Sequence, residues 1–129
     1  MEINEYSPSA LAYLGDCVLE IQTRTRLVKT GISDAGKLNK YALLYVKASA
    51  QSEAFERIEK ALDEEELSWF KRGRNYKNTH IPKNAKTSDY RRATGLETLF
   101  GFLHISGKQE RIAELFDMAF PINNEEDLK

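Results

Sequence analysis

The sequence has only one cysteine, Cys17, in 129 residues. A lone cysteine excludes an internal disulfide framework and is typical of a reducing compartment, so we expect a cytoplasmic protein. We expect Cys17 to be a small buried core residue, because no histidine or basic residue stands near it in sequence to activate its thiol. No stretch resembles a signal peptide, and none approaches the ~18 consecutive apolar residues of a membrane-spanning helix. Secreted and membrane proteins are therefore not expected.

Strand-like alternation of apolar and polar residues is also missing, and helical spacing takes its place. Helix N-caps are expected at three places, at Ser7 before Pro8, at Asp63, and at Thr87 or Ser88. The predicted helices cover residues 8–29, 35–39 continuing or kinking into 40–62, 64–73, 88–105 and 110–120. We therefore predict an all-α fold, a helical bundle.

The composition is that of one globular domain. Hydrophobic residues make up 41% of the chain and charged residues 30%, and 14.8 kDa leaves no room for a sizeable second core. We predict a single domain over residues 1–129 with its core in 8–120. Residues 121–129 are expected to form a disordered acidic tail that begins at a proline.

Acids are absent from Leu67 through Ser88, although the net charge of the chain is only −1. The part after Gly73 has no helical periodicity, which predicts a long basic loop over residues 74–87. Loops of this length in small domains are usually functional, and a local positive patch can attract nucleic acid when net charge does not. An ordinary solvated loop is the alternative. The basic residues of the run are Lys71, Arg72, Arg74, Lys77, Lys83 and Lys86.

The first helix contains a glycine next to an acid. An apolar stripe with helical spacing is expected to face the core, comprising Leu11, Leu14, Val18 and Ile21. Asp16 and Glu20 lie one turn apart on another face. Gly15 costs roughly 1 kcal/mol relative to alanine inside a helix, and close approach of another backbone is the usual reason for such a residue. Solvated acids on an amphipathic helix are the alternative.

A second acid, Glu97, stands inside a stretch that is apolar almost all round and that contains Gly95 and Gly101. A buried carboxylate without a partner costs several kcal/mol, so Glu97 requires a cation, a metal ion or a shifted pKa. An ion pair with Arg91, Arg92 or a lysine of another helix would be purely structural. Two carboxylates converging from separate helices would instead suit Mg²⁺, which takes few protein oxygens and keeps its waters.

These residues resemble a known family. Leu14-Gly15-Asp16, followed about eighty residues later by Leu96-Glu97-Thr98-Leu99-Phe100-Gly101, is similar to the two catalytic signatures of the ribonuclease III family. Two further segments, Lys71-Arg-Gly-Arg-Asn75 and Pro82-Lys-Asn84, resemble those of its short bacterial subfamily, Mini-ribonuclease III, which has the nuclease domain without a double-stranded-RNA-binding domain. The resemblance covers roughly residues 8–120 and implies a ribonuclease III-like nuclease domain.

The departures from the longer members of the family limit what carries over. Those members have a glutamate where this chain has Ala12 and an aspartate where it has Thr94. The resemblance therefore implies only Asp16 and Glu97 as catalytic and metal-binding residues. Glu20 is added as a possible metal-site residue from its position on the Asp16 face, and an exposed structural acid is the alternative.

The resemblance implies a Mg²⁺-dependent endonuclease that cuts double-stranded RNA and leaves 5′-phosphate ends. It also implies a homodimer and precursor 23S ribosomal RNA as substrate. Because the subfamily lacks a separate binding domain, we expect the basic loop to hold the RNA. A non-catalytic RNA-binding or ribosome-associated helical module is the main alternative, and a plain helical interaction protein is a third. The expected RNA-binding residues are Arg72, Arg74, Asn75, Lys77, Lys83, Asn84 and Lys86.

Overall fold

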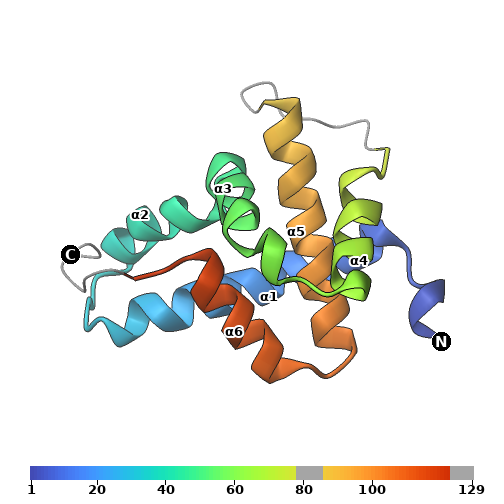
Figure 1. Ribbon diagram of the computed structural model, residues 1–129. Coiled ribbons are helices and arrows are strands. Elements are labelled where there is room, and N and C mark those ends of the chain that lie inside the picture. The colour runs from blue at the N-terminus through green and yellow to red at the C-terminus, as the bar shows by residue number, and fades with distance from the viewer. Residues whose placement is uncertain (78–85, 123–129) are drawn as a thin grey trace.

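Helix α5, Thr87–Ile105, is the central element of the computed structural model, which describes residues 1–77 and 86–122. Helices α1, α3, α4 and α6 all pack against it, and Figure 1 shows α5 rising through the middle of the molecule. In chain order the elements are η1 Ile3–Glu5, α1 Pro8–Lys29, α2 Ala35–Val46, α3 Ala48–Ile58, η2 Glu59–Ala61, α4 Glu64–Arg74, α5 Thr87–Ile105 and α6 Gln109–Ala119. The described residues contain no strand, so the all-α prediction is confirmed.

The composition of α5 explains its place. Apolar residues occur all round this helix rather than along one stripe, so it can be stable only with other helices on every side. Five of its large side chains are at most 1% exposed, Leu96, Leu99, Phe100, Phe102 and Leu103. The core forms around them.

Helix α1 begins as predicted, with the Ser7 side chain accepting a hydrogen bond from the Ala10 N–H at 3.0 Å. Its predicted buried stripe is wrong in part. Leu11 and Val18 are buried, but Ile21 is 59% exposed. The buried prediction for Cys17 is also wrong, since its side chain is exposed. The close contact that α5 makes at Gly15 rotates the buried side of α1 away from both residues.

The predicted helix over 40–62 is also wrong. The chain forms two helices, α2 and α3, separated at Lys47, whose ψ of 143° is extended. Residues Glu59–Ala61 then form a 3-10 turn. Both helices have good helix-forming residues near the junction, so propensity alone could not locate the break.

The ends of the later helices are partly as predicted. Asp63 caps α4, and its side chain accepts from the Glu66 N–H at 2.8 Å. The N-cap of α5 is Lys86 rather than Thr87 or Ser88, and no side chain caps it. No helix within residues 1–77 and 86–122 is both long and apolar enough to cross a membrane. The expected tail from Asn123 onward lies outside the described residues.

Candidate active site

Two glycines bring α1 and α5 into backbone contact. A Cβ atom at Gly15 would lie 1.6 Å from the Glu97 carbonyl oxygen, and one at Gly101 would lie 1.9 Å from the Leu11 carbonyl oxygen. No side chain fits at either position, so the crossing requires glycine on both helices. The close approach predicted for Gly15 is confirmed. It places Asp16, the next residue on α1, beside Glu97 on α5.

A second crossing holds α5 from its other side. A Cβ atom at Gly73 of α4 would lie 2.2 Å from Oγ1 of Thr98, and Thr98 itself is fully buried. The Thr98 hydroxyl lies 2.8 Å from the Thr94 carbonyl oxygen and 3.3 Å from the Pro8 carbonyl oxygen. The turn of α5 that contains Glu97 is therefore fixed between α1 and α4.

The carboxyl groups of Asp16 and Glu97 lie close enough to interact. Burial, the charge of Asp16 and a hydrogen bond between the two side chains together raise the pKa of Glu97 from 4.5 to about 8. No described cationic side chain forms an ion pair with Glu97, so the structural ion pair considered as an alternative is absent from residues 1–77 and 86–122. Arg92, one of its possible partners, instead pairs with Glu56 of α3 at 2.9 Å.

The pair is suited to a hard divalent cation. A buried carboxylate whose pKa is raised by a neighbouring carboxylate, as that of Glu97 is, is stabilised by a positive ion placed between the two. Within the described part of the chain no third His, Cys, Asp or Glu joins them as a possible ligand. Glu20 instead contacts Arg24, with 3.5 Å between the guanidinium and the carboxylate. Mg²⁺ commonly binds through one or two carboxylates and completes its shell with water and phosphate oxygens, so this donor set fits it.

Uncharged residues, Ala12 and Thr94, occupy the two positions where longer members of the family have acids. Ala12 is buried. Thr94 lies one turn before Glu97, and its hydroxyl donates to the Tyr90 carbonyl oxygen at 3.1 Å. Asp16 and Glu97 are thus the two acids of the signatures that face each other.

The expected RNA-binding residues fall at the end of α4 and the start of α5. The Arg72 guanidinium carbon lies 3.8 Å from the centre of the Trp69 ring. This stacking contact was not predicted, although the three-residue spacing of Trp69 and Arg72 could have indicated it. Arg74 donates to the Asn75 side chain at 3.1 Å. Lys77 and Lys86 are exposed, whereas Lys83 and Asn84 lie outside the described residues.

Comparison with known proteins agrees with this geometry. The family model for the ribonuclease III domain matches residues 9–108, which contain both glycine crossings and both acids. The chain belongs to the ribonuclease III family. It is 41% identical to Mini-ribonuclease 3 of Clostridium tetani over 96% of this chain and 83% of that one. It is 44% identical to Mini-ribonuclease 3 of Brevibacillus brevis over 92% of this chain and 89% of that one.

A solved structure has the same fold. The crystal structure of a protein from Fusobacterium nucleatum superposes with a TM-score of 0.80 at 33% identity, covering 89% of this chain and 92% of that one. The resemblance to Mini-ribonuclease III inferred from the short motifs is therefore confirmed across most of the chain.

Proposed function

We propose that this ribonuclease III family member is an endoribonuclease that cleaves double-stranded RNA with Mg²⁺ held by Asp16 and Glu97. The observation that supports this most directly is the carboxyl pair itself, brought together by the Gly15–Gly101 crossing and without a cationic partner among the described residues. A carboxyl pair of this kind costs free energy in the free protein, and such a cost is typical of functional sites.

Each acid has a defined part in the proposed reaction. When bound, Mg²⁺ would activate a water molecule and stabilise negative charge on the phosphate oxygens. Glu97 must give up its proton to serve as a ligand, and the charge of its neighbour sets how readily this happens. Asp16 is more exposed than Glu97 and so lies on the side of the pair that RNA can reach. The rigid helix crossing keeps both side chains in position without rearrangement. The expected products have 5′-phosphate ends.

The basic segment at the end of α4 is proposed to hold the RNA backbone. Arg72 and Arg74 are placed by aromatic side chains beneath them, Trp69 and Phe70. Stacking on a ring leaves the guanidinium edge free to donate to phosphate. We also propose roles for Asn75, Lys77 and Lys86 from this surface, and for Lys83 and Asn84 from their sequence position. Phosphate contacts of this kind set orientation rather than sequence preference.

A homodimer would present one site to each strand of a duplex. The exposed side of α1 offers apolar surface for such a contact, since Tyr13 is 86% exposed and Ile21 59%, with exposed Cys17 between them at four-residue spacing. Light scattering is expected to give about twice 14.8 kDa. A monomer that still makes double-strand cuts would contradict this part of the proposal.

The proposed natural substrate is precursor 23S ribosomal RNA in the cytoplasm. The support is the similarity to proteins named Mini-ribonuclease 3 and the lone cysteine. A strain without this protein should accumulate the uncut precursor, and the purified protein should cut that precursor in vitro.

The Asp16→Asn variant tests the catalytic assignment. It removes a ligand charge at nearly constant volume, so cleavage of an RNA duplex in Mg²⁺ should fall by roughly a thousandfold or more, while helical circular dichroism and gel-shift binding remain. Glu20→Gln is the matched control on the same helix and should cleave nearly as well as wild type if Glu20 only pairs with Arg24. Binding without cleavage by the wild-type protein would instead support a non-catalytic RNA-binding module, which the residues Ala12 and Thr94 make worth testing.

A further inference from the structure

Helix α2 lies in a part of the sequence that has no acid. From Ala35 to Ser52 the chain contains no Asp or Glu but has three lysines, Lys37, Lys40 and Lys47. Lys37 and Lys40 are three residues apart on α2, and Lys47 follows at its junction with α3. At 1.5 Å per helical residue, the three positions span roughly 15 Å along the helix.

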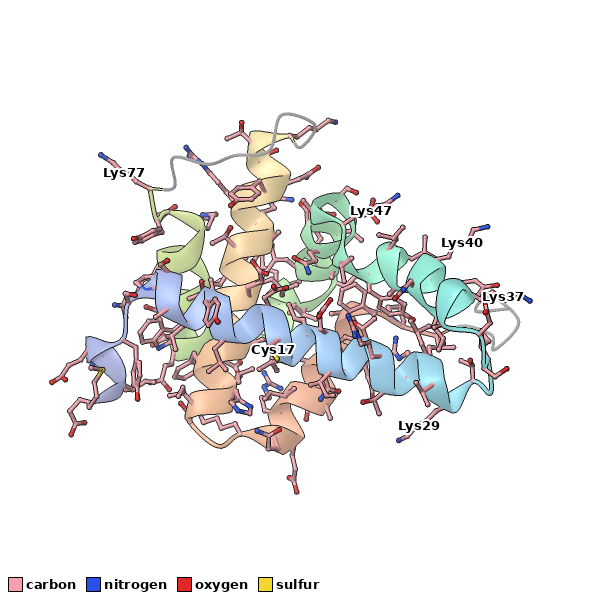
Figure 2. All side chains as sticks on the ribbon, turned by 180° about the vertical axis from the view of Figure 1, so that it is seen from behind. Cys17, Lys29, Lys37, Lys40, Lys47 and Lys77 are labelled. Atoms are coloured by element: carbon pink, nitrogen blue, oxygen red, sulfur yellow. The ribbon has the colours of Figure 1, made fainter. Side chains whose placement is uncertain are left out.

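The lysines lie on the side of α2 that the core does not use. Tyr45 is the only buried residue of this helix, and the three lysines are all exposed. Figure 2 shows them along the outer edge of α2, directed away from α1. Lys37 and Lys40 also line an open pocket of about 440 Å³ with the turn that precedes α2.

These three lysines are among the basic residues that form no ion pair with a described acid. Some exposed cations elsewhere in the described residues pair with acids, as in Arg57 with Glu53 and Lys108 with Glu65, whereas others, such as Lys29 and Lys60, do not. No described acid pairs with Lys37, Lys40 or Lys47. Three unpaired like charges on one helix repel each other, and a polyanion would relieve that repulsion.

The three lysines and the basic end of α4 lie on different sides of the part of α1 next to Asp16 (Figure 2). In Figure 2, Cys17, the neighbour of Asp16, lies between Lys77 on one side and the three lysines on the other. In that view, positive charge therefore lies on both sides of this part of α1, at the end of α4 and along α2.

We propose that Lys37, Lys40 and Lys47 form a second phosphate-binding surface, the α2 lysine face, which holds the RNA duplex on the side of the catalytic pair opposite to the basic segment of α4. This inference rests on the proposed function, because it concerns the same duplex. Lysine suits the role as a flexible point charge that follows a phosphate backbone without reading its sequence. Phosphate contacts at both the basic segment of α4 and the α2 lysine face would fix the direction in which the duplex crosses Asp16 and Glu97.

A protein partner is the competing occupant of this face. Leu43 and Leu44 are 50% and 58% exposed on the same helix and could contact apolar side chains. RNA is favoured because the surface has charge of one sign only, and protein interfaces are depleted in lysine.

The test measures duplex affinity against salt concentration in the Asp16→Asn background, where RNA is not cut. Lys37→Ala combined with Lys40→Ala should lower the log–log slope by about 1.5, since each lost phosphate contact removes roughly 0.7–0.9. Adding Lys47→Ala should lower it further. The control pair, Lys29→Ala with Lys60→Ala, removes two exposed lysines outside α2 and should change the slope by less than about half a unit. Lys37→Arg with Lys40→Arg keeps the charges and should retain the wild-type slope.

An unchanged slope in the alanine variants, with wild-type protein that cleaves duplex RNA, would overturn the α2 lysine face and leave the proposed function intact. A wild-type protein that neither cuts nor binds the duplex would overturn both. If the slope is unchanged and Leu43→Ser with Leu44→Ser alters the mass in solution, the face contacts protein instead of RNA.

Discussion

Glu66 and Glu97 are both glutamates withdrawn from solvent on helices, yet their environments move their pKa values in opposite directions. Burial acts to raise the pKa of Glu66, but hydrogen bonds from Arg111 and from the Asp63 N–H, together with the charge of Arg111, outweigh it and lower the pKa. Burial also raises the pKa of Glu97, and there the neighbouring acid, Asp16, raises it further. The sign of the partner's charge decides whether the pKa of the buried glutamate is lowered or raised.

The first arrangement holds the fold together. Arg111 donates from Nε and Nη2 to both oxygens of Glu66 at 2.8 Å, and Nη2 also donates to the Ala61 carbonyl oxygen. One of those carboxylate oxygens accepts from the Asp63 N–H, which completes the capping box of α4. The charge of Glu66 is neutralised within the chain by Arg111. At Glu97 the described residues provide no cation, so neutralisation must come from a proton or an added ion.

The largest expected effect comes from separating the carboxyl pair. Gly15→Ala places a methyl group 1.6 Å from the Glu97 carbonyl oxygen, so α1 must move away from α5. We expect a loss of more than roughly 4 kcal/mol in the free energy of unfolding and no measurable cleavage. The control is Gly36→Ala on α2, where the nearest atom is an Asp34 side-chain oxygen at 3.2 Å and stability should change by less than about 1 kcal/mol. Chemical denaturation of both variants checks this, and a Gly15→Ala protein of wild-type stability would contradict the crossing.

The glycines also show how far the sequence could predict the site. A glycine inside a helix beside an acid, repeated in a second helix, was enough to predict a close crossing that brings Asp16 to Glu97. The exact rotation of α1 could not be predicted in the same way. A stripe that continues to Ile21 satisfies helical spacing, but the glycine contact determines which side of α1 faces α5, and Ile21 lies outside that side.

The second expected effect is confined to stability. Glu66→Ala leaves Arg111 without its bidentate partner and α4 without half of its capping box, so the free energy of unfolding should fall by about 3 kcal/mol at pH 7. Glu66→Gln still accepts hydrogen bonds and should lose less. Because the pKa of Glu66 is lowered, this stabilisation is present above its ordinary value of 4.5 and is lost as pH falls below it. Duplex cleavage by folded Glu66→Ala protein should stay within a few-fold of wild type, and a collapse in activity would mean that the two acids are coupled.

The Glu66–Arg111 pair was not predicted, for a physical reason. Glu66 has the local role expected of an acid in the first turn of a helix, and nothing nearby in sequence indicates a partner. Arg111 lies 45 residues away on α6, and only the packing of α4 against the C-terminal part of the fold brings the two side chains together. Local patterns identify caps and crossings, whereas long-range ion pairs depend on the tertiary arrangement.

The smallest expected effect is the most specific to Glu97. Its pKa in the folded protein is about 8, above the 4.5 expected when the chain is unfolded. Between these values the unfolded chain releases a proton that the folded protein keeps, so this group makes stability fall as pH rises from about 4.5 to 8. Glu97→Gln cannot ionise and should remove that fall. The variant should therefore be more stable than wild type at pH 8 without metal by roughly 1–3 kcal/mol, while losing cleavage. Denaturation at pH 5, 6.5 and 8 in a chelator measures the difference.

Asp16→Asn is the matched comparison and should reduce the pH dependence of stability without abolishing it, because burial is the larger cause of the raised pKa of Glu97. Adding Mg²⁺ should stabilise wild type more at pH 8 than at pH 6 and should have little effect on Glu97→Gln. If Glu97→Gln is instead destabilised at every pH, Glu97 stabilises the fold as Glu66 does, and the contrast between the two acids fails.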